Sequence, residues 1–329
     1  MGASLLAGCE GAEPSGAQTK ILGAGAAAGK RAAVSVGLVT KTLLNPFFVE
    51  VERGARRAEH DLGLRLKVRT GAQETSVEQQ IQIVEDLIRD KVAAIVIAPS
   101  DSQRLVGVLK NAHDMGIVVV NIDNRLDPEA VHAAGWTPPP FISVDNEAGA
   151  FKAAQFLARS VSGPSQAGIL DGIRSADNAK QRVLGARCGF AQNPQVRVVA
   201  SRSANWELDQ AHAVTREMLQ QHPRLSLLFA SNDVMAIGAI RFLRETGRTH
   251  VRVAGYDALP EAIDAIRAGA LVATVDQQAA EQGYQGVVQA YRLLQGQPVP
   301  PLTLIETRLV TAQTLVDPVR ETQGLGTRL

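Results

Sequence analysis

The chain has few cysteines, few aromatic residues and no marked excess of charge of either sign. Its two cysteines, Cys9 and Cys188, are too few for a disulfide framework or a cysteine-based zinc site. The formal net charge is +1, which excludes the basic field expected of a nucleic-acid-binding protein. No apolar run approaches the roughly 20 residues that span a bilayer, so no transmembrane helix is predicted.

The sequence also lacks a recognisable catalytic constellation. Its six histidines include no HExxH pair, and none follows a predicted strand, so neither a metal site nor a histidine base is expected. The segment 163–167 departs from the nucleophile elbow, because Ala167 replaces its second glycine. Cys188 lies in the helical pattern 178–192, which favours a buried, unreactive thiol. We therefore predict no catalytic residue, no cofactor and no metal.

The N-terminus contains Leu6-Ala7-Gly8-Cys9, which resembles the lipobox at which bacterial lipoprotein precursors are cleaved and lipidated on cysteine. A signal peptide needs an apolar region of roughly 7–15 residues after a positive one, and only eight residues precede Cys9. Either the start is truncated or the match is accidental. The residues up to 32 are rich in Gly and Ala, so we expect a signal remnant and flexible tether over 1–32, with Cys9 as the candidate lipid anchor.

What the chain does contain is a regular alternation of strand-like and helix-like segments from Ala33 onward, typical of parallel sheets built from βα units. The segment 135–141 holds three prolines and is predicted to be an irregular linker. A helix is predicted over 76–90. The predicted strands are 33–40, 64–69, 93–98 and 117–122, then 167–170, 196–201, 225–230 and 251–255.

Two segments of the chain resemble each other. Each runs through a strand, a polar turn, a helix and a second strand that ends in aspartate. The aspartates are Asp101 and Asp123 in the first copy, and Asp233 and Asp257 in the second. Convergent α/β patterning could produce the same rhythm, but the matched polar turns favour two similar doubly wound lobes that aim acidic residues at one cleft.

The stretch KTLLNPFF (41–48) stands between a buried strand and a helix, and is predicted to be a ligand-binding turn. Asn45 suits the N-cap and Pro46 the first helical position. In open α/β sheets, ligands bind beyond the carboxyl ends of strands. This turn carries a cation, an amide and two aromatic rings at such a strand end, a combination that would suit a sugar.

Polar and aromatic residues gather at the other predicted strand ends as well. Carboxylates, amides and guanidinium groups form forked hydrogen bonds to hydroxyls, while aromatic rings cover the C–H faces of a sugar. Lys41 and Arg182 balance Asp123 and Asp257, as expected for a neutral polyhydroxylated ligand. The predicted ligand-binding residues are Lys41, Asn45, Phe47, Phe48, Asp123, Asn124, Arg182, Trp206, Asn232, Asp257 and Gln277.

Each of these residues has a structural alternative. Asn45 can serve only as a cap, Phe47 only as core, and Trp206 only as a packed surface aromatic. Their joint placement at strand ends favours a binding site.

Eight motifs occur in order along the chain: KTLLNPFF, IAPSDS, VVVNIDN, SVDNEAGA, the Arg182-x-x-Gly185 helix, FASNDVMAIGA, VAGYDALPEA and ATVDQ. Together these motifs resemble the periplasmic sugar-binding proteins of bacterial ABC importers, in the ribose, allose and galactose branch. The resemblance covers roughly 33–311. The Lys-Thr-Leu-x-Asn-Pro-Phe opening and the Trp in SANWELD are most similar to the allose-binding type. Two positions depart from the ribose branch: Ala98 replaces an Asn, and Asn124 replaces an Arg or Glu.

The resemblance implies a type I binding protein with two doubly wound parallel-sheet lobes joined by a three-segment hinge, which closes on one sugar. The first lobe is expected over 33–144 plus 278–306 and the second over 145–277 plus 307–316, with Gln277 at the hinge and a tail at 317–329.

The implied function is extracytoplasmic capture of a monosaccharide, an aldopentose or aldohexose, and its delivery to an ABC permease with ATPase subunits. The protein is expected to be a monomer and to bind no nucleic acid, and a chemoreceptor is a further candidate partner. Two rival hypotheses are the sugar-sensing domain of a lactose-repressor-like regulator, which would need an N-terminal helix-turn-helix, and a sugar-processing enzyme that uses Asp123 and Asp257 as a carboxylate pair.

Overall fold

A computed structural model describes residues 34–316 of the chain. The predicted anchor at Cys9, the tether over 1–32 and the tail over 317–329 lie outside the described residues. Within 34–316, no helix combines the length and apolar character that crossing a membrane requires.

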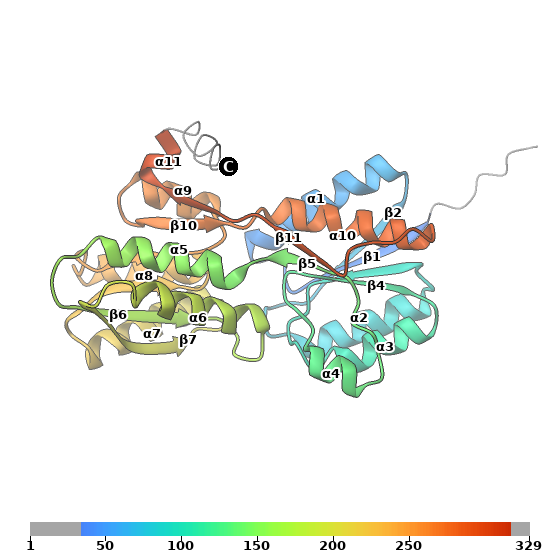
Figure 1. The fold of residues 1–329 in the computed structure, drawn as a ribbon, viewed down its shortest axis with the longest axis horizontal. Coiled ribbons are helices and arrows are strands. Elements are labelled where there is room, and N and C mark those ends of the chain that lie inside the picture. The colour runs from blue at the N-terminus through green and yellow to red at the C-terminus, as the bar shows by residue number, and fades with distance from the viewer. Residues whose placement is uncertain (1–33, 317–329) are drawn as a thin grey trace, which may run out of the picture. The chain divides into compact units, whose positions relative to one another are not determined.

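The described chain contains two six-stranded sheets with helices on both faces (Figure 1). We call each sheet with its helices a lobe. In the first lobe the strand order is β11-β5-β4-β3-β1-β2, and the paired strands are parallel. Its elements are β1 (Ser35–Thr40), α1 (Pro46–Leu62), β2 (Arg65–Thr70), α2 (Val77–Arg89), β3 (Ala94–Ile97), α3 (Val106–Asp114), β4 (Val118–Ile122), α4 (Pro128–Ala133), β5 (Phe141–Val144), α10 (Ala279–Leu294) and β11 (Leu302–Ile305).

The second lobe repeats this plan with the order β12-β10-β9-β8-β6-β7. Its edge strand β12 pairs antiparallel with β10, so this sheet departs from the all-parallel expectation at one edge. Its elements are α5 (Asn146–Arg159), β6 (Ser165–Asp171), α6 (Asp177–Phe190), β7 (Val196–Ser203), α7 (Leu208–Gln221), β8 (Leu225–Ala230), α8 (Asp233–Glu245), β9 (Arg252–Ala254), α9 (Pro260–Arg267), β10 (Ala273–Asp276), β12 (Arg308–Thr311) and α11 (Ala312–Val316).

The chain passes between the two sheets three times. It crosses from β5 to α5, from β10 to α10, and from β11 to β12. The three crossings agree with the three-segment hinge expected from the sequence, and Gln277 lies in the second of them. Because each connection is short, the C-terminal ends of strands from both sheets can face the same region.

Burial on both faces explains why the strands are short apolar runs. All four residues of β3 are buried, as expected where helices cover both sides of a parallel sheet. In the first lobe, α1 and α10 cover one face and α2 to α4 the other (Figure 1). Helices α1 and α10 meet closely at Gly54, where a β-carbon would lie 1.7 Å from the carbonyl oxygen of Ala280.

All eight strands predicted from the sequence form, with ends shifted by a few residues. The segment predicted to be irregular, 135–141, is so up to residue 140, but Phe141 begins β5. The prediction for Cys188 is wrong, because its side chain is exposed. Helix α6 turns Gly185, Ala186 and Gly189 inward, and Cys188 lies on the opposite face.

Candidate functional site

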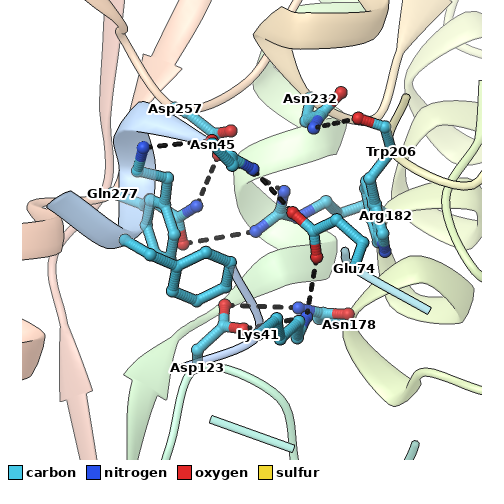
Figure 2. Close-up of a pocket in the computed structure, with 12 residues that line it drawn as sticks. Lys41, Asn45, Glu74, Asp123, Asn178, Arg182, Trp206, Asn232, Asp257 and Gln277 are labelled. Atoms are coloured by element: carbon cyan, nitrogen blue, oxygen red, sulfur yellow. Dashed lines mark hydrogen bonds and ion pairs between the residues drawn. The ribbon is translucent and has the colours of Figure 1, made fainter. Parts of the chain in front are cut away.

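A cavity lies where strand ends of both sheets converge (Figure 2). Most of its lining residues follow strands or begin helices, the two places where backbone direction turns side chains beyond the sheet edge. They are Lys41, Asn45, Phe47, Phe48, Glu74, Asp123, Asn178, Arg182, Trp206, Asn232, Asp257 and Gln277.

The turn after β1 is built as the sequence predicts. Asn45 is the N-cap of α1, and its Oδ1 accepts the backbone N–H of Phe47 at 3.0 Å. Pro46 occupies the first turn of the helix. Lys41 is 2% exposed, and its Nζ lies 3.2 Å from Asp123 Oδ2 at the end of β4. A buried ammonium beside a buried carboxylate offers both a donor and an acceptor to a hydroxyl group.

Glu74, in the loop after β2, is a third carboxyl group in the cavity. Its Oε1 accepts the side-chain N–H of Asn45 at 2.8 Å, while its Oε2 lies 4.0 Å from Lys41 Nζ. Burial raises the pKa of Glu74 to about 7, although Lys41 and Asn45 oppose the shift. The charge balance predicted from the sequence, two cations against Asp123 and Asp257, therefore omitted a third carboxyl group.

Arg182 is held from several sides in the second lobe. Its Nε donates to Asn146 Oδ1 at 2.8 Å, and its Nη1 donates to the carbonyl oxygen of Ser231 at 2.8 Å. Its guanidinium lies over the Tyr256 ring, 3.8 Å from the ring centre. These contacts fix the planar donor fork before any ligand binds, which reduces the entropy cost of binding.

Asp257 and Gln277 complete the polar wall beside Arg182. Gln277 Nε2 donates to Asp257 Oδ1 at 2.5 Å, and Arg182 Nη2 donates to Gln277 Oε1 at 3.2 Å. Arg182 Nη1 lies 3.5 Å from Asp257 Oδ1. Burial raises the pKa of Asp257 well above its ordinary value, and Arg182 opposes that shift.

Aromatic rings reach the cavity from both lobes. Phe47 and Phe48 form an edge-to-face pair with ring centres 5.0 Å apart. Lys41 Nζ lies 5.6 Å from the Phe48 ring centre and 5.9 Å from that of Trp206. Trp206 packs directly on Gly172, where a β-carbon would lie 2.0 Å from the indole ring. Such rings favour the C–H faces of a flat, polyhydroxylated ligand.

Two buried side-chain atoms at the site, Asn178 Oδ1 and Trp206 Nε1, have no hydrogen-bond partner among residues 34–316, and Asp123 Oδ2 has only its ion pair with Lys41. Asp123, Trp206 and Asp257 also adopt positive φ values of 60°, 69° and 123°. Unpaired buried polar atoms and strained backbone are both costly, and both concentrate where a ligand completes the structure.

The structure brings the predicted residues together with one exception. Asn124 does not line the cavity, because its side chain turns toward the β3–α3 loop and donates to the carbonyl oxygen of Pro99 at 3.0 Å. Asn232 lines the cavity and also caps α8, since its Oδ1 accepts the N–H of Met235 at 2.9 Å. Of the paired aspartates, Asp123 and Asp257 reach the cavity.

Asp101 and Asp233 have structural roles instead. Asp101 accepts the backbone N–H groups of Gln103 and Arg104. Asp233 accepts the N–H of Leu259 and the hydroxyl of Thr274.

Sequence reasoning missed Glu74 and Asn178. Glu74 follows β2, a strand whose C-terminal end lies at the same sheet edge as that of β1, so its position carried a usable signal. Asn178 precedes Arg182 by four residues, which places both on one face of α6. Its Nδ2 donates to Asp123 Oδ1 at 3.3 Å.

Within 34–316, no group of His, Cys, Asp and Glu side chains could hold a metal ion.

Comparison with known proteins gives a consistent picture. A model of the periplasmic binding protein domain matches residues 36–298. The D-ribose/D-allose-binding protein of Pseudomonas aeruginosa is 39% identical over 265 residues, which cover 80% of this chain and 82% of that protein.

Two solved structures extend the comparison. A solute binding protein of Actinobacillus succinogenes with bound D-allose has a TM-score of 0.80 and 34% identity, over 85% of this chain and 98% of that one. A solute binding protein of Burkholderia multivorans has a TM-score of 0.81 and 37% identity, over 85% of this chain and 99% of that one.

Proposed function

Because this chain belongs to the periplasmic binding protein domain family, we propose that it captures a monosaccharide between its two lobes and delivers it to an ABC permease. The observation that carries this proposal is the composition of the cavity. Aromatic rings, a lysine, an arginine, carboxylates and amides converge there from both lobes. This is the mixture that binds hydroxyl groups on a ring's rim and C–H groups on its faces.

The proposed ligand is an aldopentose or aldohexose of the ribose or allose kind. Relatives named for ribose and allose, and a similar structure that holds D-allose, support this choice. The opening turn with Lys41, and Trp206 in the second lobe, favour the allose-like branch.

The ligand-binding residues we propose are those the sequence predicted, without Asn124 and with Glu74 and Asn178 added. Lys41, Asp123 and Asn45 would hold hydroxyl groups from the first lobe. Arg182 and Asp257 would do so from the second lobe. Phe48 and Trp206 would approach the two sides of the sugar ring.

The site is proposed to bind its ligand without chemical change. Its relatives are named as binding proteins, and its charged side chains already pair with one another. The protein would work outside the cytoplasm, facing the permease at the membrane. The two lobes would correspond to 33–144 with 278–306 and to 145–277 with 307–316. Lipidation at Cys9 would keep the protein beside that permease, and a single chain would be the binding unit.

Isothermal titration calorimetry against a panel of aldoses, ketoses and inositols tests the proposal. We expect one ligand per chain, micromolar or tighter binding for at least one aldose, and a change in Trp206 fluorescence. Mass spectrometry of ligand released by denaturation should return the added sugar unchanged. A folded protein that binds no panel member more tightly than millimolar would contradict the proposal. Recovery of a chemically altered sugar would indicate an enzyme instead.

A further inference from the structure

Helix α6 begins without a cap of its own. Its N-cap residue is Ala176, with φ −87° and ψ 130°. This extended backbone conformation is the usual one for an N-cap, but alanine has no side-chain acceptor to offer. The first backbone N–H groups of a helix have no partner within the helix, so a buried helix start needs acceptors from elsewhere. Asn178, in this first turn, is 3% exposed.

The missing acceptors come from the other lobe. Ser102 Oγ, in the loop between β3 and α3, accepts the N–H of Asp177 at 3.0 Å. Asn124 Oδ1, just after β4, accepts the N–H of Asn178 at 3.3 Å. Ser102 and Asn124 are fully buried or nearly so, at 2% and 0% exposure. The first lobe therefore caps a helix of the second.

The two capping side chains are held in place within their own lobe. Asn124 Nδ2 donates to the carbonyl oxygen of Pro99 at 3.0 Å and to Ser102 Oγ at 3.3 Å. The N–H of Ser102 also reaches across to the carbonyl oxygen of Ser175 at 3.4 Å. Neither Ser102 nor Asn124 lines the cavity, so the two capping side chains are distinct from the ligand-binding ones, although the capped backbone includes that of the cavity residue Asn178.

We propose that Ser102 and Asn124 form an interlobe latch, which stabilises the closed protein by capping α6 and does not contact the sugar. The inference rests on the proposed function, because the lobes close around a ligand. When the lobes separate, water replaces the two acceptors. When they close, the cap is restored. The start of α6 then places Asn178 against Asp123 and places Arg182 at the cavity.

The latch gives Asn124 a positioning role in place of the ligand contact expected from its strand-end position. A positioning residue changes the stability of the closed state equally for every ligand. A ligand-contacting residue changes the preference among sugars, because different hydroxyl groups lose different partners.

Ser102→Ala tests the latch most directly, because it removes one acceptor and leaves the cavity lining intact. With D-allose and D-ribose as probes, we expect dissociation constants weaker by about fivefold for both sugars, the change that corresponds to loss of one ordinary helix cap. The ratio of the two constants should not change, and stopped-flow fluorescence should place the loss in the dissociation rate. Ser226→Ala is the matched control, because the Ser226 hydroxyl donates to Gln166 within the second lobe.

Two results would overturn the latch. One is a Ser102→Ala protein that binds both sugars as tightly as the wild type. The other is a changed preference between the sugars, which would place Ser102 in contact with ligand. Failure of the wild type to bind any sugar would instead count against the proposed function, so the two failures are distinguishable.

Ala176→Ser provides a second, independent test. A serine at the N-cap accepts the N–H of the second or third helical residue, here Asn178 or Ala179, so in the open protein it would replace the acceptor that Asn124 supplies on closure. We expect Ala176→Ser to weaken sugar binding, and Asn124→Ala to cost less in that background than in the wild type. Strict additivity of the two substitutions would contradict the latch, because independent sites add and sites that share a partner do not. Unfolding of each sugar-free variant, followed by circular dichroism, checks that the protein remains folded.

Discussion

The ammonium of Lys41 lies 3.2 Å from the carboxylate of Asp123, and both residues stand at strand ends of the same sheet. The second lobe contains its own pair, because Arg182 Nη1 lies 3.5 Å from Asp257 Oδ1. Each lobe therefore carries a preformed cation and carboxylate to the cavity. Of the three carboxyl groups that line the cavity, that of Glu74 lies farthest from a cation, at 4.0 Å from Lys41 Nζ.

Lys41→Ala should weaken sugar binding and destabilise the folded protein. The substitution leaves Asp123 buried without its cation, and breaking a buried pair costs about 3–5 kcal/mol of unfolding free energy. Loss of one hydrogen bond from a charged group would weaken affinity by about 2 kcal/mol, or roughly 30-fold. Calorimetry and urea unfolding measure the two effects.

The matched control for Lys41 is Lys67→Ala, which removes a surface pair with Asp90. Such a pair contributes less than about 1 kcal/mol, and sugar affinity should not change. Unaltered affinity in Lys41→Ala would remove this residue from the site, together with the main reason for favouring the allose-like branch.

Sugar affinity should fall as the pH rises toward and through 7. The buried Glu74 has its pKa raised from 4.5 to about 7, so the closed protein binds a proton that a water-exposed Glu74 would release. Protonation of Glu74 therefore favours closure most below pH 4.5. This contribution to the free energy of closure is lost progressively as the pH rises through the raised pKa of about 7. Burial also raises the pKa of Asp257, which acts in the same direction.

Glu74→Gln isolates this contribution. Calorimetry in buffers of different ionisation enthalpy should show proton uptake on binding to the wild type near pH 7, on the order of half a proton per ligand. The amide variant should take up less and have a flatter affinity profile. Equal uptake in the two proteins would assign the proton to another group.

Gly172→Ala should displace Trp206 and weaken sugar binding. A β-carbon at this position would lie 2.0 Å from the indole ring, and overpacking of this kind typically costs about 1–3 kcal/mol. Tryptophan fluorescence should change in the sugar-free protein. Gly163→Ala is the control in the same lobe, because its β-carbon would meet no atom within 4 Å. A Gly172→Ala protein with wild-type fluorescence and affinity would mean that the indole ring is not fixed by this contact.

Gly54→Ala should lower the unfolding midpoint through the packing of α1 on α10. Its β-carbon would overlap the Ala280 carbonyl oxygen, so the two helices would have to separate. Gly107→Ala, in α3, meets no atom within 4 Å and should instead stabilise the protein by up to about 1 kcal/mol, since alanine favours helix over glycine. Differential scanning calorimetry of both variants distinguishes crowding from helix propensity. A midpoint for Gly54→Ala at or above that of the wild type would contradict the close helix contact.

The sequence by itself determined the alternation of strands and helices, because periodicity and capping are local properties of the chain. Asn45 and Pro46 specify the start of α1 through their own backbone preferences. Position at a strand end was enough to predict most residues of the cavity, since parallel strands in one sheet end at the same edge.

Only the tertiary structure decided which side chains point into that cavity. Asn124 and Asp123 are neighbours in sequence, yet Asp123 reaches the cavity while Asn124 caps a helix of the other lobe. Glu74 and Asn178 enter the site through a loop and a helix turn whose placement depends on how distant segments pack. Likewise, the faces that α6 buries against its neighbours left Cys188 exposed. The local pattern specifies the elements, but burial and pairing across the lobes assign each polar side chain its partner.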